Sequence, residues 1–166
     1  MPTLERLRPG HEAALLAFER ANRAYFARTV SDRGEAYFTG FAARHRALLA
    51  EQAAGVCHFH VVLDDRGEIV GRVNLMDVAA GSAELGYRIG EHAAGRGLAT
   101  AMVGEICGLA RAAYGLSALT ARTTADHTAS RTVLERNGFT VTGNITVAGR
   151  PGVHYRRHLS PDTGRP

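Results

Sequence analysis

The sequence contains no lysine, and all twenty of its basic residues are arginine. Without lysine the chain cannot form the Gly-Lys-Ser/Thr loop that holds nucleoside triphosphates, so that class of site is excluded. Cysteine is almost as scarce. Cys57 and Cys107 lie far apart, each within an apolar run. This placement is typical of small buried side chains and argues against both a disulfide and a metal pair.

Long apolar runs are absent as well. No stretch approaches the roughly 20 residues that a membrane-spanning helix needs. The N-terminus is charged at Glu5, Arg6 and Arg8 and lacks the apolar centre of a signal peptide. The sequence therefore predicts a protein of the reducing cytoplasm with no membrane partner.

Length and composition are those of one globular domain. A chain of 166 residues, 45% hydrophobic and 22% charged, can bury a core without disulfides. We expect a single domain over 1–166, with 160–166 as a flexible tail. The net charge of +4 favours an anionic ligand. The arginines are scattered and no aromatic residues interleave with them, which argues against a nucleic-acid partner.

Apolar spacing predicts strands and helices in a definite order. The predicted strands are 3–7, 56–63, 68–78, 83–89, 116–123, 139–145 and 153–159, and the predicted helices are 11–28, 37–52, 97–113 and 127–137. Three consecutive strands form an antiparallel meander, whereas the long crossover helix implies parallel pairing of the strands it connects. This order predicts an α/β (α+β) fold with a mixed, mostly antiparallel sheet of about seven strands and helices on both faces.

The stretch 83–102 reads as a strand, a short loop and a helix. Gly95 and Gly97 stand where the helix begins, and free N–H groups together with a positive dipole end suit a phosphate there. Glycine also lets the backbone approach a bulky anion closely. The alternative is that the two glycines only shape a tight turn. Thr100 stands where a dinucleotide fingerprint has its third glycine, which disfavours a dinucleotide-binding fold.

Three motifs in the right order resemble the GNAT superfamily of acetyl-CoA-dependent N-acetyltransferases. The family signature Gln/Arg-x-x-Gly-x-Gly/Ala is similar to 94–99, Ala-Gly-Arg-Gly-Leu-Ala. The segment 127–139 resembles the family's Asn-x-x-Ser…Leu-Glu-x-x-Gly-Phe. Ala-Glu-Leu-Gly-Tyr at 83–87 is similar to the branch that includes enzymes acetylating the N-termini of ribosomal proteins. The resemblance spans nearly the whole chain.

Three residues depart from the family pattern. Ala94 replaces the first Gln or Arg, so one side-chain contact to the pyrophosphate is missing. His127 replaces an Asn whose amide contacts the pantetheine arm, although imidazole can still donate one hydrogen bond. Leu134 stands where many relatives have the Tyr that protonates the leaving thiolate.

The resemblance implies that acetyl-CoA is a cosubstrate. An acetyl group would pass to a primary amine, either a protein N-terminus or a small molecule, by direct attack in a ternary complex. Backbone groups of 87–89 would pair with pantetheine, as an added strand would, and amides of 95–100 would hold the pyrophosphate. The implied cofactor-binding residues are Tyr87, Arg88, Ile89, Ala94, Gly95, Arg96, Gly97, Leu98, Ala99, Thr100, His127 and Ser130.

Acetyl transfer to an ammonium requires a base, because the nitrogen needs a free lone pair. Glu84, a carboxylate within a strand beside the cofactor-binding segment, is the first candidate. The alternative is a salt-bridged Glu on the other face of the sheet. Ser130 is the candidate that assists the departing thiolate, directly or through water. The alternative for Ser130 is a contact with the cofactor only.

The sequence also permits functions other than acetyl transfer. A non-catalytic CoA-binding regulatory module is the main alternative, motivated by Ala94, His127 and the missing Tyr. An arginine-rich nucleic-acid binder is a third, and it predicts steep salt dependence. His58 and His60 share one strand face without an evident third ligand, so we expect no metal. The acceptor amine is not specified, and a homodimer is only the default among oligomeric states.

Overall fold

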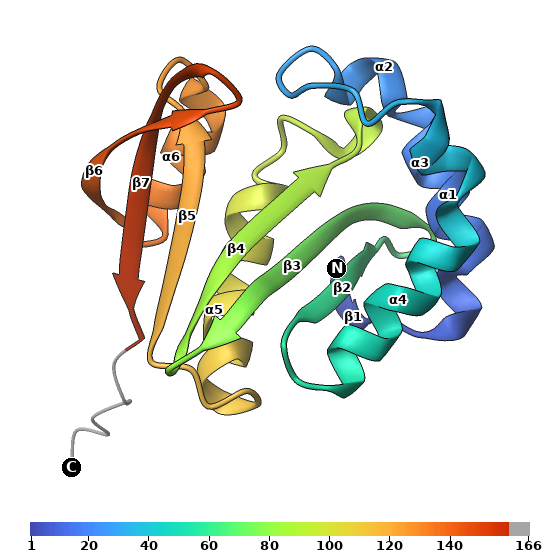
Figure 1. The fold of residues 1–166 in the computed structure, drawn as a ribbon, viewed down its shortest axis with the longest axis horizontal. Helices are drawn as coiled ribbons and strands as arrows, with labels where there is room; N and C mark the ends of the chain where they lie inside the picture. The colour runs from blue at the N-terminus through green and yellow to red at the C-terminus, as the bar shows by residue number, and fades with distance from the viewer. Residues whose placement is uncertain (160–166) are drawn as a thin grey trace.

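The structure, a computed structural model, describes residues 1–159, so the predicted tail at 160–166 lies outside the described residues. Its centre is one seven-stranded sheet in the order β1-β2-β3-β4-β5-β7-β6 (Figure 1). The strands are β1 (Thr3–Arg6), β2 (His58–Leu63), β3 (Ile69–Ala79), β4 (Ser82–Ile89), β5 (Ala118–Thr124), β6 (Thr140–Val147) and β7 (Arg150–His158). The predicted mixed, mostly antiparallel α/β fold is confirmed.

The sheet changes direction at its middle, as predicted. β2, β3 and β4 form the antiparallel meander. β4 and β5 are parallel, and their register contains only three pairs, of which Glu84 with Thr120 is the last. Beyond that pair the two strands diverge (Figure 1). The β5-facing edge of β4 is thereby left without a strand partner over residues 85–89, which positions the site described below.

The helices cover both faces of the sheet. On one face lie α1 (Glu12–Ala21) and α4 (Phe41–Ala53), and on the other lie α5 (Leu98–Ala112) and α6 (Thr128–Arg136) (Figure 1). Two buried clusters result. One contains Leu75, Leu85 and Ile106 between the sheet and α5, and the other contains Leu15 and Phe59 between the sheet and α1. Burial of such apolar side chains is the main driving force for this arrangement.

Two predicted helices are interrupted in the structure. The predicted helix 11–28 consists of a short 3₁₀ turn (Pro9–His11), α1 and α2 (Arg23–Phe26), with the break at Asn22. The Asn22 amide donates to the carbonyl of Phe18 at 2.9 Å, while its oxygen accepts from the backbone of Glu91 at 2.9 Å. An Asn side chain that bonds backbone in this way competes with helix continuation. The second helix is likewise divided at Gly40 into α3 (Glu35–Thr39) and α4.

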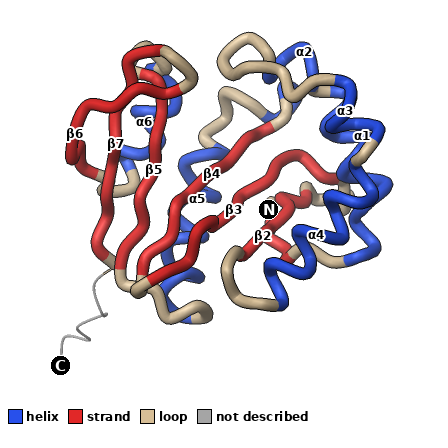
Figure 2. The backbone as a smooth tube through the Cα atoms, in the orientation of Figure 1, coloured by secondary structure: helices blue, strands red, loops and turns tan. Residues whose placement is uncertain are grey.

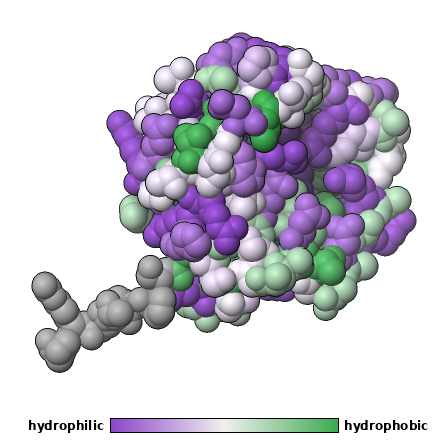
Figure 3. Space-filling model, turned by 60° about the vertical axis from the view of Figure 1, so that its left-hand side comes forward, coloured by the Kyte–Doolittle hydropathy of each residue, from purple (hydrophilic) through white to green (hydrophobic). Residues whose placement is uncertain are grey.

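Figure 2 shows that the loop after α2 and the loop after β4 lie at the same end of the molecule. The face in Figure 3 is mostly hydrophilic, with small separate apolar areas. Within residues 1–159, no helix has the length and apolarity that crossing a membrane requires.

His58 and His60 pack against Tyr114, which follows the end of α5. The His58 ring stacks on that of Tyr114 with 3.7 Å between the centroids, and Nε2 of His60 lies 2.6 Å from the Tyr114 hydroxyl. In the described part of the chain, no three potential metal-binding side chains of the His, Cys, Asp or Glu type cluster together. The absence of a metal stays a prediction.

Candidate active site

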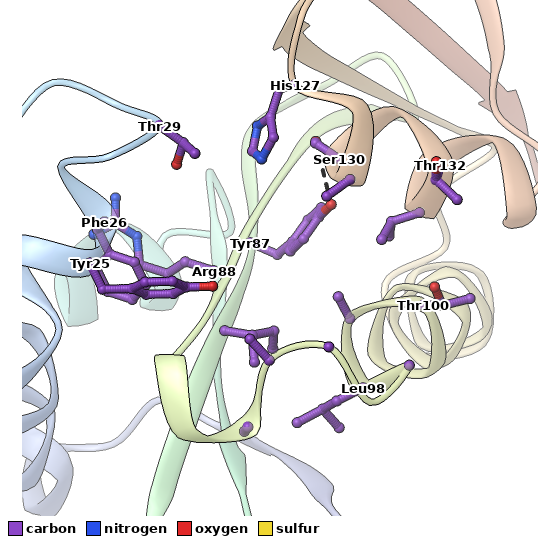
Figure 4. A pocket seen from close by; sticks show the side chains of 18 of the residues that line it. Tyr25, Phe26, Thr29, Tyr87, Arg88, Leu98, Thr100, His127, Ser130 and Thr132 are labelled. Carbon is purple, nitrogen blue, oxygen red and sulfur yellow. Dashed lines mark hydrogen bonds between the residues drawn. The ribbon is translucent and has the colours of Figure 1, made fainter.

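The main pocket lies beside the unpaired edge of β4. Its volume is about 560 Å³, and its walls are the end of β4, the loop 93–97, the first turns of α5 and α6, and α2 with the loop that follows it (Figure 4). The pocket brings together most of the predicted cofactor-binding residues: Tyr87, Arg88, Ile89, Ala94, Gly95, Gly97, Leu98, Ala99, Thr100, His127 and Ser130. Arg96 is exposed and does not line it.

The start of α5 forms one wall of the pocket. Gly97 is the N-cap residue, with φ of 76°, and no side chain caps the helix. Gly95 has φ of 75°, and an added Cβ at either glycine would meet no atom within 4 Å. Both glycines therefore adopt the left-handed conformation that other residues avoid. The uncapped N–H groups and the open space in front of them suit an anion such as a diphosphate.

The start of α6 forms the opposite wall. His127 is the N-cap residue of this helix, and Ser130 lies in its first turn. The Tyr87 hydroxyl donates a hydrogen bond to Oγ of Ser130 at 3.4 Å, and the three side chains converge in Figure 4. Burial raises the pKa of Tyr87, so its phenol stays protonated, and burial lowers the pKa of His127, so its imidazole stays neutral.

Glu84 does not line the pocket. Its carboxylate accepts a hydrogen bond from Nε of Arg122 at 2.7 Å, and its side chain is 21% exposed. Glu84 is also the β4 residue of the last β4–β5 pair, so it lies at the point where the strands begin to separate. The arrangement matches the salt-bridged alternative that the sequence left open.

A shared ion pair lies on the face of the sheet next to α1. Arg72 on β3 and Arg88 on β4 are direct cross-strand neighbours. Glu19 of α1 lies between them and accepts from both guanidinium groups at 3.0 Å. The Glu19 side chain is only 2% exposed. Two like charges on paired strands would repel each other, and this single carboxylate compensates for one of them.

Sequence reasoning missed two parts of the site. The hydroxyl of Tyr87 was not singled out, because only its backbone was expected to take part. The available signal was the even strand alternation that places Tyr87 on the α5 and α6 face. Arg28, Thr29 and Val30 also line the pocket, and they come from a loop with no motif of its own. The side-chain oxygen of Asn22 accepts a hydrogen bond from the backbone of Glu91, which ties the start of this segment to the loop after β4.

Comparison with known proteins identifies the family and the fold. Residues 3–140 match the family model described as the acetyltransferase (GNAT) domain. No curated protein matches the chain. The fold is shared with the ribosomal-protein-S5-alanine acetyltransferase from Vibrio fischeri, which is 18% identical with a TM-score of 0.88; the match covers 99% of this chain and 96% of that one.

Two further solved structures are similar. Mycobacterium smegmatis RimJ in complex with CoA-disulfide is 23% identical, with a TM-score of 0.84 and coverage of 95% of this chain and 81% of that one. The spermidine N-acetyltransferase from Vibrio cholerae, in complex with CoA and spermine, is 15% identical, with a TM-score of 0.79 and coverage of 95% of both chains. At these identities the likeness concerns the fold. The family match spans most of the chain, and the protein is therefore a member of the GNAT acetyltransferase family.

Proposed function

We propose that the protein is a cytoplasmic N-acetyltransferase that moves an acetyl group from acetyl-CoA to a primary amine by direct attack in a ternary complex. The single observation that supports this best is the uncapped N-terminus of α5, which faces the same pocket as the unpaired edge of β4. One feature suits a diphosphate, and the other suits an extended amide chain such as pantetheine. Two neighbours of the same fold were solved with CoA.

The residues present fit this cosubstrate. Peptide N–H groups from Gly95 to Thr100 would hold the diphosphate, since no side chain occupies the space in front of them. Backbone groups of 87–89 would pair with the pantetheine amides. Ala94 contributes only a methyl group, so backbone donors supply the binding that a Gln or Arg supplies in relatives. When bound, acetyl-CoA supplies a thioester whose acetyl carbon the amine attacks.

We propose Glu84 as the base that accepts the amine proton through a water molecule. Its carboxylate lies at the fork between β4 and β5, on the strand that would bind the cosubstrate. The carboxylate is held in place by Nε of Arg122 at 2.7 Å and remains 21% exposed, so a water molecule can reach it. The C–N bond then forms as the C–S bond breaks, and a backbone N–H of β4 stabilises the charge that develops on the carbonyl oxygen.

We propose Ser130 as the proton donor to the departing thiolate, with Tyr87 behind it. Leu134, where many relatives have Tyr, is 1% exposed and fills the core. The Tyr87 hydroxyl reaches Ser130 from β4 at 3.4 Å, so it can return a proton to the serine oxygen. Burial keeps this phenol protonated by raising its pKa. The phenol that many relatives carry at the position of Leu134 is thus replaced by one from β4.

One observation favours a second function, a CoA-binding regulatory module. None of the described residues that line the pocket carries a carboxylate. An assay of the purified protein with acetyl-CoA and a panel of primary amines separates the two functions, with CoA thiol release measured by a colorimetric reagent and each product identified by mass spectrometry. Amine-dependent thiol release with an acetylated product supports the enzyme. Cosubstrate binding without transfer to any amine supports the regulatory module.

A further inference from the structure

A shallow recess adjoins the main pocket on the side away from α6. The two share Phe26, Val30 and Arg88 in their walls. The recess has a volume of about 10 Å³, which is room for about one water molecule. A group bound here would therefore lie at the mouth of the recess, next to Arg88, while the rest of the ligand stays in the main pocket.

The carboxylates of this recess are already occupied by arginines. Glu19 accepts from both Arg72 and Arg88 at 3.0 Å. Asp32 accepts from Nε and Nη2 of Arg23 at 3.0 Å and 2.9 Å, and also from the backbone of Gly34. Each acid therefore has its charge compensated. Neither is free to bind the ammonium groups of a polyamine.

The walls of the recess carry more guanidinium groups than carboxylates. Among residues 1–159, no carboxylate lies within ion-pair distance of Arg33, whose guanidinium carbon lies 4.6 Å from the centre of the Tyr37 ring. Arg72 is 5% exposed, and its Nε has no hydrogen-bond partner within the described residues. Arg88 bonds Glu19 through Nη1 and stacks on Phe26 at 4.4 Å. Desolvation and then the charge of Arg88 lower the pKa of Arg33, and the nearby Tyr37 and Glu19 offset this only in part.

We infer that the amine substrate bears an anionic group, a carboxylate or a phosphate, which Arg33 and Arg88 bind at the mouth of the recess. This inference rests on the proposed function and specifies its substrate class. Guanidinium groups form charge-assisted, often bidentate, hydrogen bonds with both groups. An amine of this class places its anion against the two arginines and its nitrogen toward β4. A polyamine meets uncompensated positive charge at the same place.

Matched pairs of amines test the inference. L-alanyl-L-alanine and its C-terminal amide differ in one negative charge, phosphoethanolamine and ethanolamine form the phosphate pair, and putrescine is the cationic probe. We expect kcat/KM to be about tenfold higher for the anionic member of at least one pair, with putrescine the poorest substrate. The pair that shows the preference identifies the anion as carboxylate or phosphate.

Two variants locate the effect. Arg33→Gln is expected to reduce the preference to less than threefold, because kcat/KM for the anionic amine falls toward that of its neutral partner. Arg44→Gln is the matched control, since Arg44 lies 6.0 Å from the same Tyr37 ring but does not line the recess. It should keep the full preference. Thermal melting curves confirm that both variants are folded.

The possible failures are distinguishable. Acetylation of both members of each pair at equal rates, or fastest acetylation of putrescine, would overturn the inference and leave the proposed function intact. An anionic preference that survives Arg33→Gln would overturn the assignment to Arg33. If no amine is acetylated while acetyl-CoA still binds, the proposed function itself fails, and the inference fails with it.

Discussion

The hydroxyl of Tyr87 donates a hydrogen bond to Oγ of Ser130 at 3.4 Å, which links the central strand to the first turn of α6. The two side chains lie 43 positions apart in sequence and meet in the wall of the pocket. Leu134 cannot donate a proton, whereas this pair places two hydroxyl groups in the pocket wall.

Replacing either hydroxyl should slow proton transfer to the thiolate. We expect Ser130→Ala to lower kcat by about 100-fold and Tyr87→Phe by about tenfold, with little change in the KM for acetyl-CoA. If the two act as one unit, the double variant should be no slower than Ser130→Ala alone, because effects within a unit are not additive. Steady-state kinetics of the three variants measure this. Fully additive losses would show that the two hydroxyls act separately.

Glu84→Gln tests the proposed base. We expect kcat to fall by about 100-fold across the whole pH range tested, since Gln cannot accept the proton. The matched control is Glu105→Gln, because Glu105 is exposed on α5 and lies outside the pocket. Rates of wild type and both variants are measured from pH 6 to pH 10. A Glu84→Gln profile equal to that of wild type at every pH would remove Glu84 from the mechanism.

A pair of alanine variants on α5 separates anion binding from helix stability. Gly97 has φ of 76°, so Gly97→Ala should strain the N-terminus by about 1–2 kcal/mol and weaken acetyl-CoA binding by at least tenfold. Gly108 lies in the same helix with open space around it, and Gly108→Ala should stabilise the protein by about 0.5–1 kcal/mol without affecting binding. Chemical denaturation and calorimetry check both. Equal affinity in the two variants would contradict an anion site at Gly97.

Acid should destabilise the fold through His60. Burial lowers the pKa of His60 to about 4 from 6.5, and its side chain bonds the carbonyl of Val73 and the hydroxyl of Tyr114. Because the folded-state pKa is depressed, the full stability is present above pH 6.5 and is lost as the pH falls toward 4. The loss should reach about 2 kcal/mol at pH 5.

Urea unfolding at pH 7.5 and pH 5 measures this loss, with His60→Gln as the comparison. The variant should be less stable at pH 7.5 but should lose at least 1 kcal/mol less between the two pH values. His11 and His58 also have pKa values lowered by burial, so some acid sensitivity should persist in the variant. An equal loss in both proteins would show that His60 does not account for the effect.

The sheet was predictable because each of its strands has local chemistry that agrees with its place in the fold. β4 alternates apolar and polar residues, and Gly97 marks the start of α5 through a backbone conformation that few other residues adopt. The resemblance to the family then placed the segment 94–100 and Ser130 at one site, and the pocket contains most of those residues. Local sequence pattern and family motifs together therefore predicted the part of the pocket that is proposed to bind the cosubstrate.

The part of the pocket formed by α2 and the loop after it was not predictable, for a physical reason. The helix break at Asn22 depends on hydrogen bonds to Phe18 and to Glu91, and the second partner is distant in sequence. The positions of Glu19, Arg72 and Arg88 likewise follow from pairing between β3 and β4 and from packing of α1. Such contacts between distant segments have no periodic signature in the sequence. They appear only when the chain is folded.

Calorimetric titration with acetyl-CoA and with S-acetylpantetheine tests the central claim most directly, because the second compound keeps the thioester and lacks the diphosphate. We predict that acetyl-CoA binds at least 100-fold more tightly than S-acetylpantetheine and that Gly97→Ala removes at least tenfold of this advantage. Equal affinities for the two compounds, or no binding of acetyl-CoA, would contradict a diphosphate site at the N-terminus of α5.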